Sequence, residues 1–131
     1  MRSFALVAAV VAFAVFPAHS RAQAQTGAEL LKNCQVVLES KPSNTAMLDG
    51  VSCLAYLRGM SETFDLWKVF NDRRKQNNPP PACVPNGVTA REIAIVVVNY
   101  IKRHPTEMHH AVSDVALTAL MDAYPCGGVS R

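Results

Sequence analysis

The chain has 131 residues, a hydrophobic fraction of 50%, and 13 basic against 10 acidic side chains. This length suits a single domain with a short leader, and leaves no room for two domains of ordinary size. The nearly balanced charge, without a basic stretch interleaved with aromatic residues, argues against nucleic-acid binding.

The first residues are typical of an export signal. Arg2 precedes an apolar run from Phe4 to Phe16, which is too short to cross a bilayer. Ala22-Gln23-Ala24 supplies the small residues that signal peptidase recognises, with Ala18-His19-Ser20 as an earlier alternative. We therefore expect residues 1–24 to be a cleaved signal peptide.

The mature chain, residues 25–131, is expected to be an exported, soluble domain without a transmembrane helix. It contains all four cysteines, which are Cys34, Cys53, Cys83 and Cys126. An even number of cysteines in a small exported chain is typical of a disulfide framework. The gaps between them are far longer than the two to four residues that usually separate paired ligands of structural zinc, so disulfides are favoured over a zinc site.

Apolar residues at helical spacing predict an all-α fold, a small bundle of about four helices braced by two disulfides. The four segments cover residues 27–40, 44–67, 90–103 and 105–124. Capping boxes at Thr26 with Glu29 and at Thr89 with Glu92 mark two of the helix starts. The β-branched run from Ile93 to Val98 also suits a strand, but the capping box and the length of the segment favour a helix.

Two glycines, Gly50 and Gly59, interrupt the second predicted helix. Each costs about 1 kcal/mol relative to alanine in a helix interior. We expect both to serve close packing between helices.

The helix positions predict how the cysteines pair. Cys83 lies just before the third helix and Cys126 just after the fourth, so an antiparallel hairpin of these helices brings them together. Cys34 and Cys53 lie within the first two helices, which a short turn around Pro42 places side by side. The predicted bonds are Cys34 with Cys53 and Cys83 with Cys126.

The segment from Lys68 to Ala82 is polar, charged and rich in proline, and predicts a long exposed loop. It is either a solvated linker or a binding loop presented to a partner. The candidate partner-binding residues on and beside it are Trp67, Phe70, Arg73 and Arg74.

The sequence offers weak candidates for chemistry. His104, Glu107, His109 and His110 gather before the last helix, but their spacing matches no metal motif and suits helix caps or surface residues. The acidic residues Asp49, Asp65, Asp114 and Asp122 are expected on solvated helix faces. Disulfide-bonded cysteines cannot act as nucleophiles, so cysteine catalysis is not expected. Because no other catalytic or metal motif is present in the sequence, we expect no catalytic residue, no metal and no cofactor.

Several motifs together resemble the Rap/Tai immunity family. They are Cys83-x-Pro85-x-Gly87-Val88-Thr89, Val96-Val97-Val98-x-Tyr100-Ile101, His104-Pro105 and Ala123-Tyr124-Pro125-Cys126, with Cys53-Leu54-Ala55-Tyr56-Leu57-Arg58-Gly59 in the first half. The resemblance implies a small helical periplasmic protein, often a homodimer, which protects bacteria that use type VI secretion. Such proteins bind and occlude papain-like peptidoglycan amidases, and this role needs no catalytic residue.

Two other functions stay open. A small disulfide-bonded periplasmic chaperone of the acid-stress type would use the charging of His104, His109 and His110 at low pH to open a dimer. A helical envelope protein with another role is also compatible, because a fold does not by itself fix a function.

Overall fold

A computed structural model describes residues 25–127 of the chain. The expected signal peptide, residues 1–24, lies outside the described residues. Within the described part, no helix is long and apolar enough to cross a membrane.

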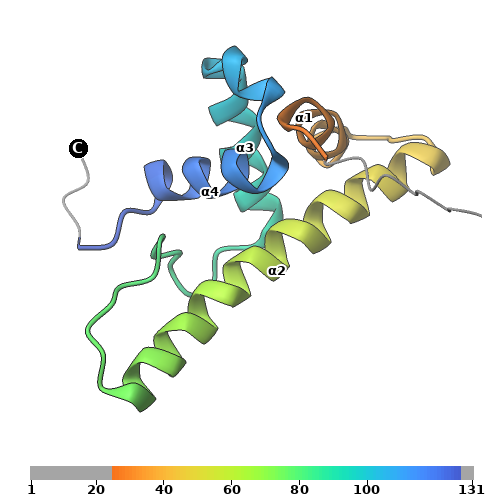
Figure 1. Ribbon diagram of the computed structural model, residues 1–131. Helices are drawn as coiled ribbons and strands as arrows, with labels where there is room; N and C mark the ends of the chain where they lie inside the picture. Colours follow the sequence, from red (N-terminus) through yellow and green to blue (C-terminus); the bar gives the residue numbers. More distant parts are fainter. Residues whose placement is uncertain (1–24, 128–131) are drawn as a thin grey trace, which may run out of the picture.

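The described chain is all-α, as predicted (Figure 1). Its elements are α1 (Gly27–Val36), α2 (Asn44–Arg74), α3 (Ala90–Arg103), a short 3-10 helix η1 (Pro105–His109) and α4 (Val112–Ala123). Residues 25–127 contain no strand; a single isolated β-bridge joins Thr26 to Ala111. The β-branched run from Ile93 to Val98 lies in α3, so the helical interpretation of this run is confirmed.

Both predicted capping boxes are present. The hydroxyl of Thr26 accepts from the backbone N–H of Glu29, and the Glu29 carboxylate accepts from the backbone N–H of Thr26 at 3.0 Å. Thr89 and Glu92 make the same reciprocal pair at the start of α3. Two orphan N–H groups at each helix start are therefore satisfied locally.

Helix α2 is longer than predicted. It continues seven residues past Trp67, to Arg74, and ends where Lys75 adopts the left-handed conformation with φ 55°. No proline or glycine interrupts residues 68–74, and Lys68 pairs with Asp65 one turn back at 3.0 Å. The prediction that the loop begins at Lys68 is therefore wrong, because a polar run continues an exposed helix until a residue leaves helical geometry.

The ends of two other helices also differ from the prediction. Helix α1 was predicted to reach Ser40 but ends at Val36. The next residues form turns with hydrogen bonds to the third residue back, such as the Leu38 N–H to the Gln35 carbonyl at 2.9 Å. The last segment is split into η1 and α4. The break falls near Ala111, where the backbone pairs with the start of the described chain. The Gly27 N–H donates to the His110 carbonyl at 3.0 Å, and the Val112 N–H donates to the Gln25 carbonyl at 2.9 Å. No local sequence pattern predicts these long-range bonds.

Helix α3 forms the centre of the core. Figure 1 shows it between α1 and α4, with α2 running along the side of these helices. Its apolar face is fully enclosed and packs with the inner faces of the other helices. The largest fully buried side chains are Cys34, Cys53, Leu57, Ile93, Val97, Val98, Ile101, Val115 and Leu120.

Both predicted disulfides are present. Cys34 and Cys53 join α1 to α2 with their Cα atoms 5.2 Å apart, and Cys83 and Cys126 join the segments before α3 and after α4 at 5.0 Å. The first bond is buried in the core, whereas both residues of the second are partly exposed. Each helix pair is thus covalently tied at one place.

Candidate functional site

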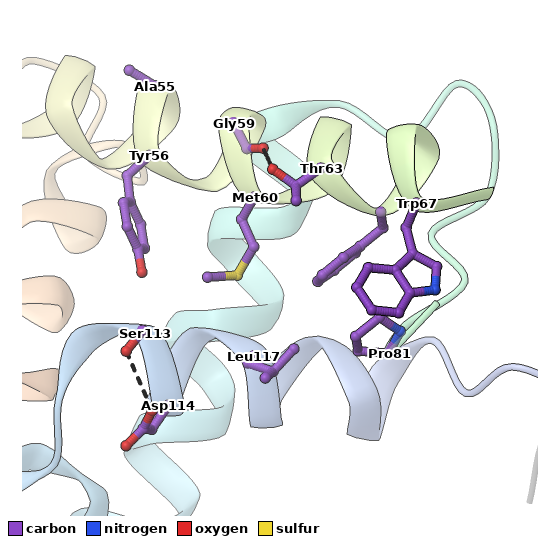
Figure 2. Close-up of a pocket in the computed structure, with 11 residues that line it drawn as sticks. Ala55, Tyr56, Gly59, Met60, Thr63, Trp67, Pro81, Ser113, Asp114 and Leu117 are labelled. Atoms are coloured by element: carbon purple, nitrogen blue, oxygen red, sulfur yellow. Dashed lines mark hydrogen bonds between the residues drawn. The ribbon is translucent and has the colours of Figure 1, made fainter. Parts of the chain in front are cut away.

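An open groove of about 690 Å³ lies between α2 and α4 (Figure 2). Tyr56 and Asp114 lie at one end and Trp67 and Pro81 at the other, as Figure 2 shows. The other residues lining it are Ala55, Gly59, Met60, Thr63, Phe64, Ser113 and Leu117. Its volume is in the range of ligand-binding sites, and its lining is mostly apolar and aromatic.

The groove follows from how the helices pack. Helices α2 and α4 both contact α3, and between them Met60 and Leu117 are only partly buried against the core. Along α2, Tyr56, Met60, Thr63 and Trp67 recur at intervals of three and four residues, which places them on one side of the helix. This stripe forms one wall, and α4 forms the other.

The loop after α2 is held against the helix. The indole N–H of Trp67 donates to the Asn78 carbonyl at 3.2 Å, and the side-chain amide of Asn71 donates to the same oxygen at 2.7 Å. Pro80 is buried, and the backbone N–H of Cys83 donates to the Tyr124 carbonyl at 2.8 Å. The segment is exposed, but it is anchored at several points and fixes Pro81 as the end wall of the groove.

Three of the four predicted partner-binding residues come together. Trp67 is 45% exposed and Phe70 is 58% exposed. With Arg74 they line a second hollow of about 350 Å³, which adjoins the groove through Trp67 and also contains Asn71, Gln76 and Asn78. Arg73 is exposed but is not among the residues that line this hollow. Their role in binding a partner stays a prediction.

The opposite end of the groove is acidic. Asp114 accepts a hydrogen bond from the Ser113 hydroxyl at 3.2 Å. Burial raises the pKa of the Tyr56 hydroxyl, and the nearby carboxylate of Asp114 raises it further. Tyr56 therefore stays a neutral phenol at neutral pH and can donate a hydrogen bond into the groove.

The histidine cluster is dispersed around η1. The ring of His104 lies against that of Tyr100, with centroids 4.4 Å apart, and its Nδ1 is 3.0 Å from the Tyr100 carbonyl oxygen. His110 Nδ1 lies 3.2 Å from a carboxylate oxygen of Glu107. In residues 25–127, no three histidine, cysteine, aspartate or glutamate side chains are grouped to hold a metal ion.

Sequence reasoning missed the α4 wall of the groove. Asp114 is exposed, as expected for a solvated helix face, but it also lines the groove, and Leu117 was not among the candidate residues. The available signal was that Leu117 is a large apolar residue in the last predicted helix. Only the crossing of α2 and α4 shows what it faces.

Comparison with known proteins identifies the family. No curated protein and no solved structure matches this chain. The model of the family described as Rap1a immunity proteins matches residues 26–126, which is most of the chain and includes all four cysteines. The match agrees with the resemblance seen in the sequence motifs, and the chain belongs to the family of Rap1a immunity proteins.

Proposed function

We propose that this chain is a periplasmic immunity protein that binds and inhibits a papain-like peptidoglycan amidase delivered by type VI secretion. Family membership is the observation that carries the proposal. An immunity protein acts on an effector protein, and the Rap/Tai resemblance implies that this effector is an amidase. Occlusion of such an enzyme requires a binding surface and no catalysis by the inhibitor.

The described structure supports an inhibitor physically. Binding is tighter when less conformational entropy is lost, and two disulfides with two capping boxes restrict this chain before it meets a partner. Trp67, Phe70 and Arg74 are of the residue types that carry most binding energy at protein interfaces or are enriched there. Their shared hollow beside the groove is therefore the proposed contact surface.

A periplasmic location is part of the proposal. Disulfides persist in oxidising compartments such as the periplasm, and both pairs are formed in the structure. The leader-like residues 1–24 would direct export.

The test uses the oxidised mature chain with purified candidate amidases. Wild type is expected to bind one of them and to stop peptidoglycan hydrolysis. Phe70→Ala is expected to weaken binding about tenfold or more, as loss of an interface anchor does. Leu48→Ala is the matched control, because Leu48 is an exposed apolar residue near the other end of α2 and should leave affinity within about twofold. If no amidase is bound or inhibited, the proposal fails for the enzymes tested.

A chaperone of the acid-stress type is the second candidate. The exposed apolar side chains along α2, including Leu48, Val51 and Leu66, are the observation that favours it. Such a chaperone should prevent aggregation of an unfolded client at about pH 3 and lose this activity at pH 7. Equal activity at both pH values, or none at either, would rule it out.

A further inference from the structure

Gly59 is a glycine without a packing reason inside the described chain. A Cβ added at Gly50 would lie 3.4 Å from Val36 Cγ1, so the expected close helix packing is confirmed there. A Cβ added at Gly59 would meet nothing within 4 Å, so the same expectation is wrong for Gly59. Its backbone is exposed and lines the groove. Since glycine costs about 1 kcal/mol in a helix interior, its presence suggests that something outside residues 25–127 approaches the α2 backbone closely.

Opposite charges flank the groove, one in its lining and one in the adjoining hollow. Asp114 lies at the end beside Tyr56, and Arg74 lies in the hollow beyond Trp67 at the other end. Neither Asp114 nor Arg74 has a salt-bridge partner among the described residues. The wall between them is apolar and aromatic. A complementary occupant therefore has an apolar face with a basic group at one end and an acidic group at the other.

We propose that this groove binds one face of an amphipathic helix from a partner protein, with an acidic first turn beside Arg74 and a basic last turn beside Asp114. The inference rests on the proposed function in one respect, because the amidase would supply the helix. The bound helix runs antiparallel to α2. Acidic residues in its first turn and basic residues in its last turn also stabilise that helix by themselves.

The shape of the groove suits a helix. It is bounded by two helices, and its α2 wall from Tyr56 to Trp67 is about 16 Å long at 1.5 Å per residue, or about three helical turns. Side chains spaced i, i+4, i+7 and i+11 on a partner helix match that length, as in other complexes where a helix lies in a groove. Gly59 lets the two backbones approach where a larger residue would hold them apart.

The first experiment uses a synthetic helical peptide as the probe. The peptide has about 18 residues, no tryptophan, four leucines at i, i+4, i+7 and i+11, glutamates in the first turn and lysines in the last turn. Trp67 is the only tryptophan of the protein and lines the groove, so a blue shift of its emission reports occupation. Wild type is expected to bind with a dissociation constant below about 1 mM.

Gly59→Leu and Gly59→Ala form a matched pair of variants. Both replace glycine with a better helix former, and both side chains enter open space, so both should fold. Leucine should block the groove and weaken peptide binding at least tenfold. Alanine adds one methyl group where the two backbones approach, so it should weaken binding less than leucine does, by about two- to fivefold. Asp114→Asn should weaken binding about two- to fivefold, as expected for one partly exposed charge pair.

Several outcomes would overturn the inference. They are absence of peptide binding by wild type up to about 1 mM, or equal affinity of Gly59→Leu and wild type for the peptide. A concentration-dependent dimer of wild type that Gly59→Leu abolishes would make a second copy of this chain the occupant, and would also overturn it.

The amidase assay separates this inference from the proposed function. If wild type and Gly59→Leu inhibit an amidase equally, the proposed function stands and the groove inference fails. If the peptide binds as expected but no amidase is bound, the groove remains a helix-binding site and the proposed function fails.

Discussion

Gly27, the first residue of α1, lies where that helix meets η1. A Cβ added there would lie 2.5 Å from the Glu107 carbonyl oxygen and 3.1 Å from Val115 Cγ2. The backbone oxygen cannot rotate away as a flexible side chain can, so any larger residue must push α1 from η1.

Gly27→Ala should therefore lower the free energy of unfolding by about 1–3 kcal/mol, the usual cost of overpacking. Gly59→Ala should raise it by about 0.5–1 kcal/mol, because the added methyl group meets open space in a helix interior. Urea unfolding of both variants beside wild type measures the two effects. A Gly27→Ala variant as stable as wild type would contradict the close contact.

The capping box of α3 predicts a pH dependence. Hydrogen bonds from the backbone N–H and the hydroxyl of Thr89, at 2.7 Å and 2.8 Å, lower the pKa of the Glu92 carboxyl. A folded-state pKa below the unfolded value of about 4.3 means that the unfolded chain binds more protons in that pH window. The stabilisation is complete above the unfolded value and is lost as the pH falls through the folded value.

The advantage of wild type over Glu92→Gln in unfolding free energy should accordingly shrink as the pH falls from 7 to below 4. Chemical denaturation at several pH values measures it. In a Thr89→Ala background the same substitution should show a somewhat weaker pH dependence. The hydroxyl no longer donates to the Glu92 carboxylate, whereas the bond from the backbone N–H, the larger cause of the lowered pKa, remains. A difference that grows on acidification would contradict the assignment.

At the scale of helices, the helix ends that depend on neighbouring residues could be predicted from the sequence. The helix ends that depend on contacts distant in the sequence could not. Thr26 and Thr89 start helices by side-chain bonds within three residues, so their positions were predicted correctly. The end of α2 depends on the left-handed conformation of Lys75, which has no sequence signature comparable to glycine. The break at Ala111 comes from pairing with Thr26, which lies far away in the sequence.

The two disulfides should differ in their response to reductant. Cys34 and Cys53 are 0% and 2% exposed, whereas Cys83 and Cys126 are partly exposed. Mild reductant on the folded protein should open Cys83–Cys126 first, because a thiol must reach the sulfur that it attacks.

Alkylation followed by mass spectrometry identifies the bond that opens. Loss of Cys83–Cys126 should also change the emission of Trp67, since that bond helps to hold the loop that bears Pro81 against the groove. In the chain-entropy model this bond, which closes 43 residues, contributes about 4 kcal/mol, and Cys34–Cys53, which closes 19, about 3 kcal/mol. Prior opening of Cys34–Cys53 would contradict the burial seen here.

For the described molecule, α3 determines where the groove lies. Because α1, α2 and α4 all contact α3, the apolar faces of all four helices are used in one core, and the groove remains where α2 and α4 diverge. The sequence indicated Trp67 and Phe70 by their position beside a polar segment. It could not indicate Asp114 or Leu117, because their side of the groove exists only through the crossing of two helices.

Titration of a purified papain-like peptidoglycan amidase with the oxidised mature chain tests the central claim most directly. We expect hydrolysis to fall in proportion to added protein and to stop near a fixed stoichiometric ratio, with Phe70→Ala requiring about tenfold more protein or higher. Leu48→Ala should follow the wild-type curve. Unchanged hydrolysis at a large excess of wild-type protein, for every amidase of this class tested, would contradict the claim that this chain is an amidase immunity protein.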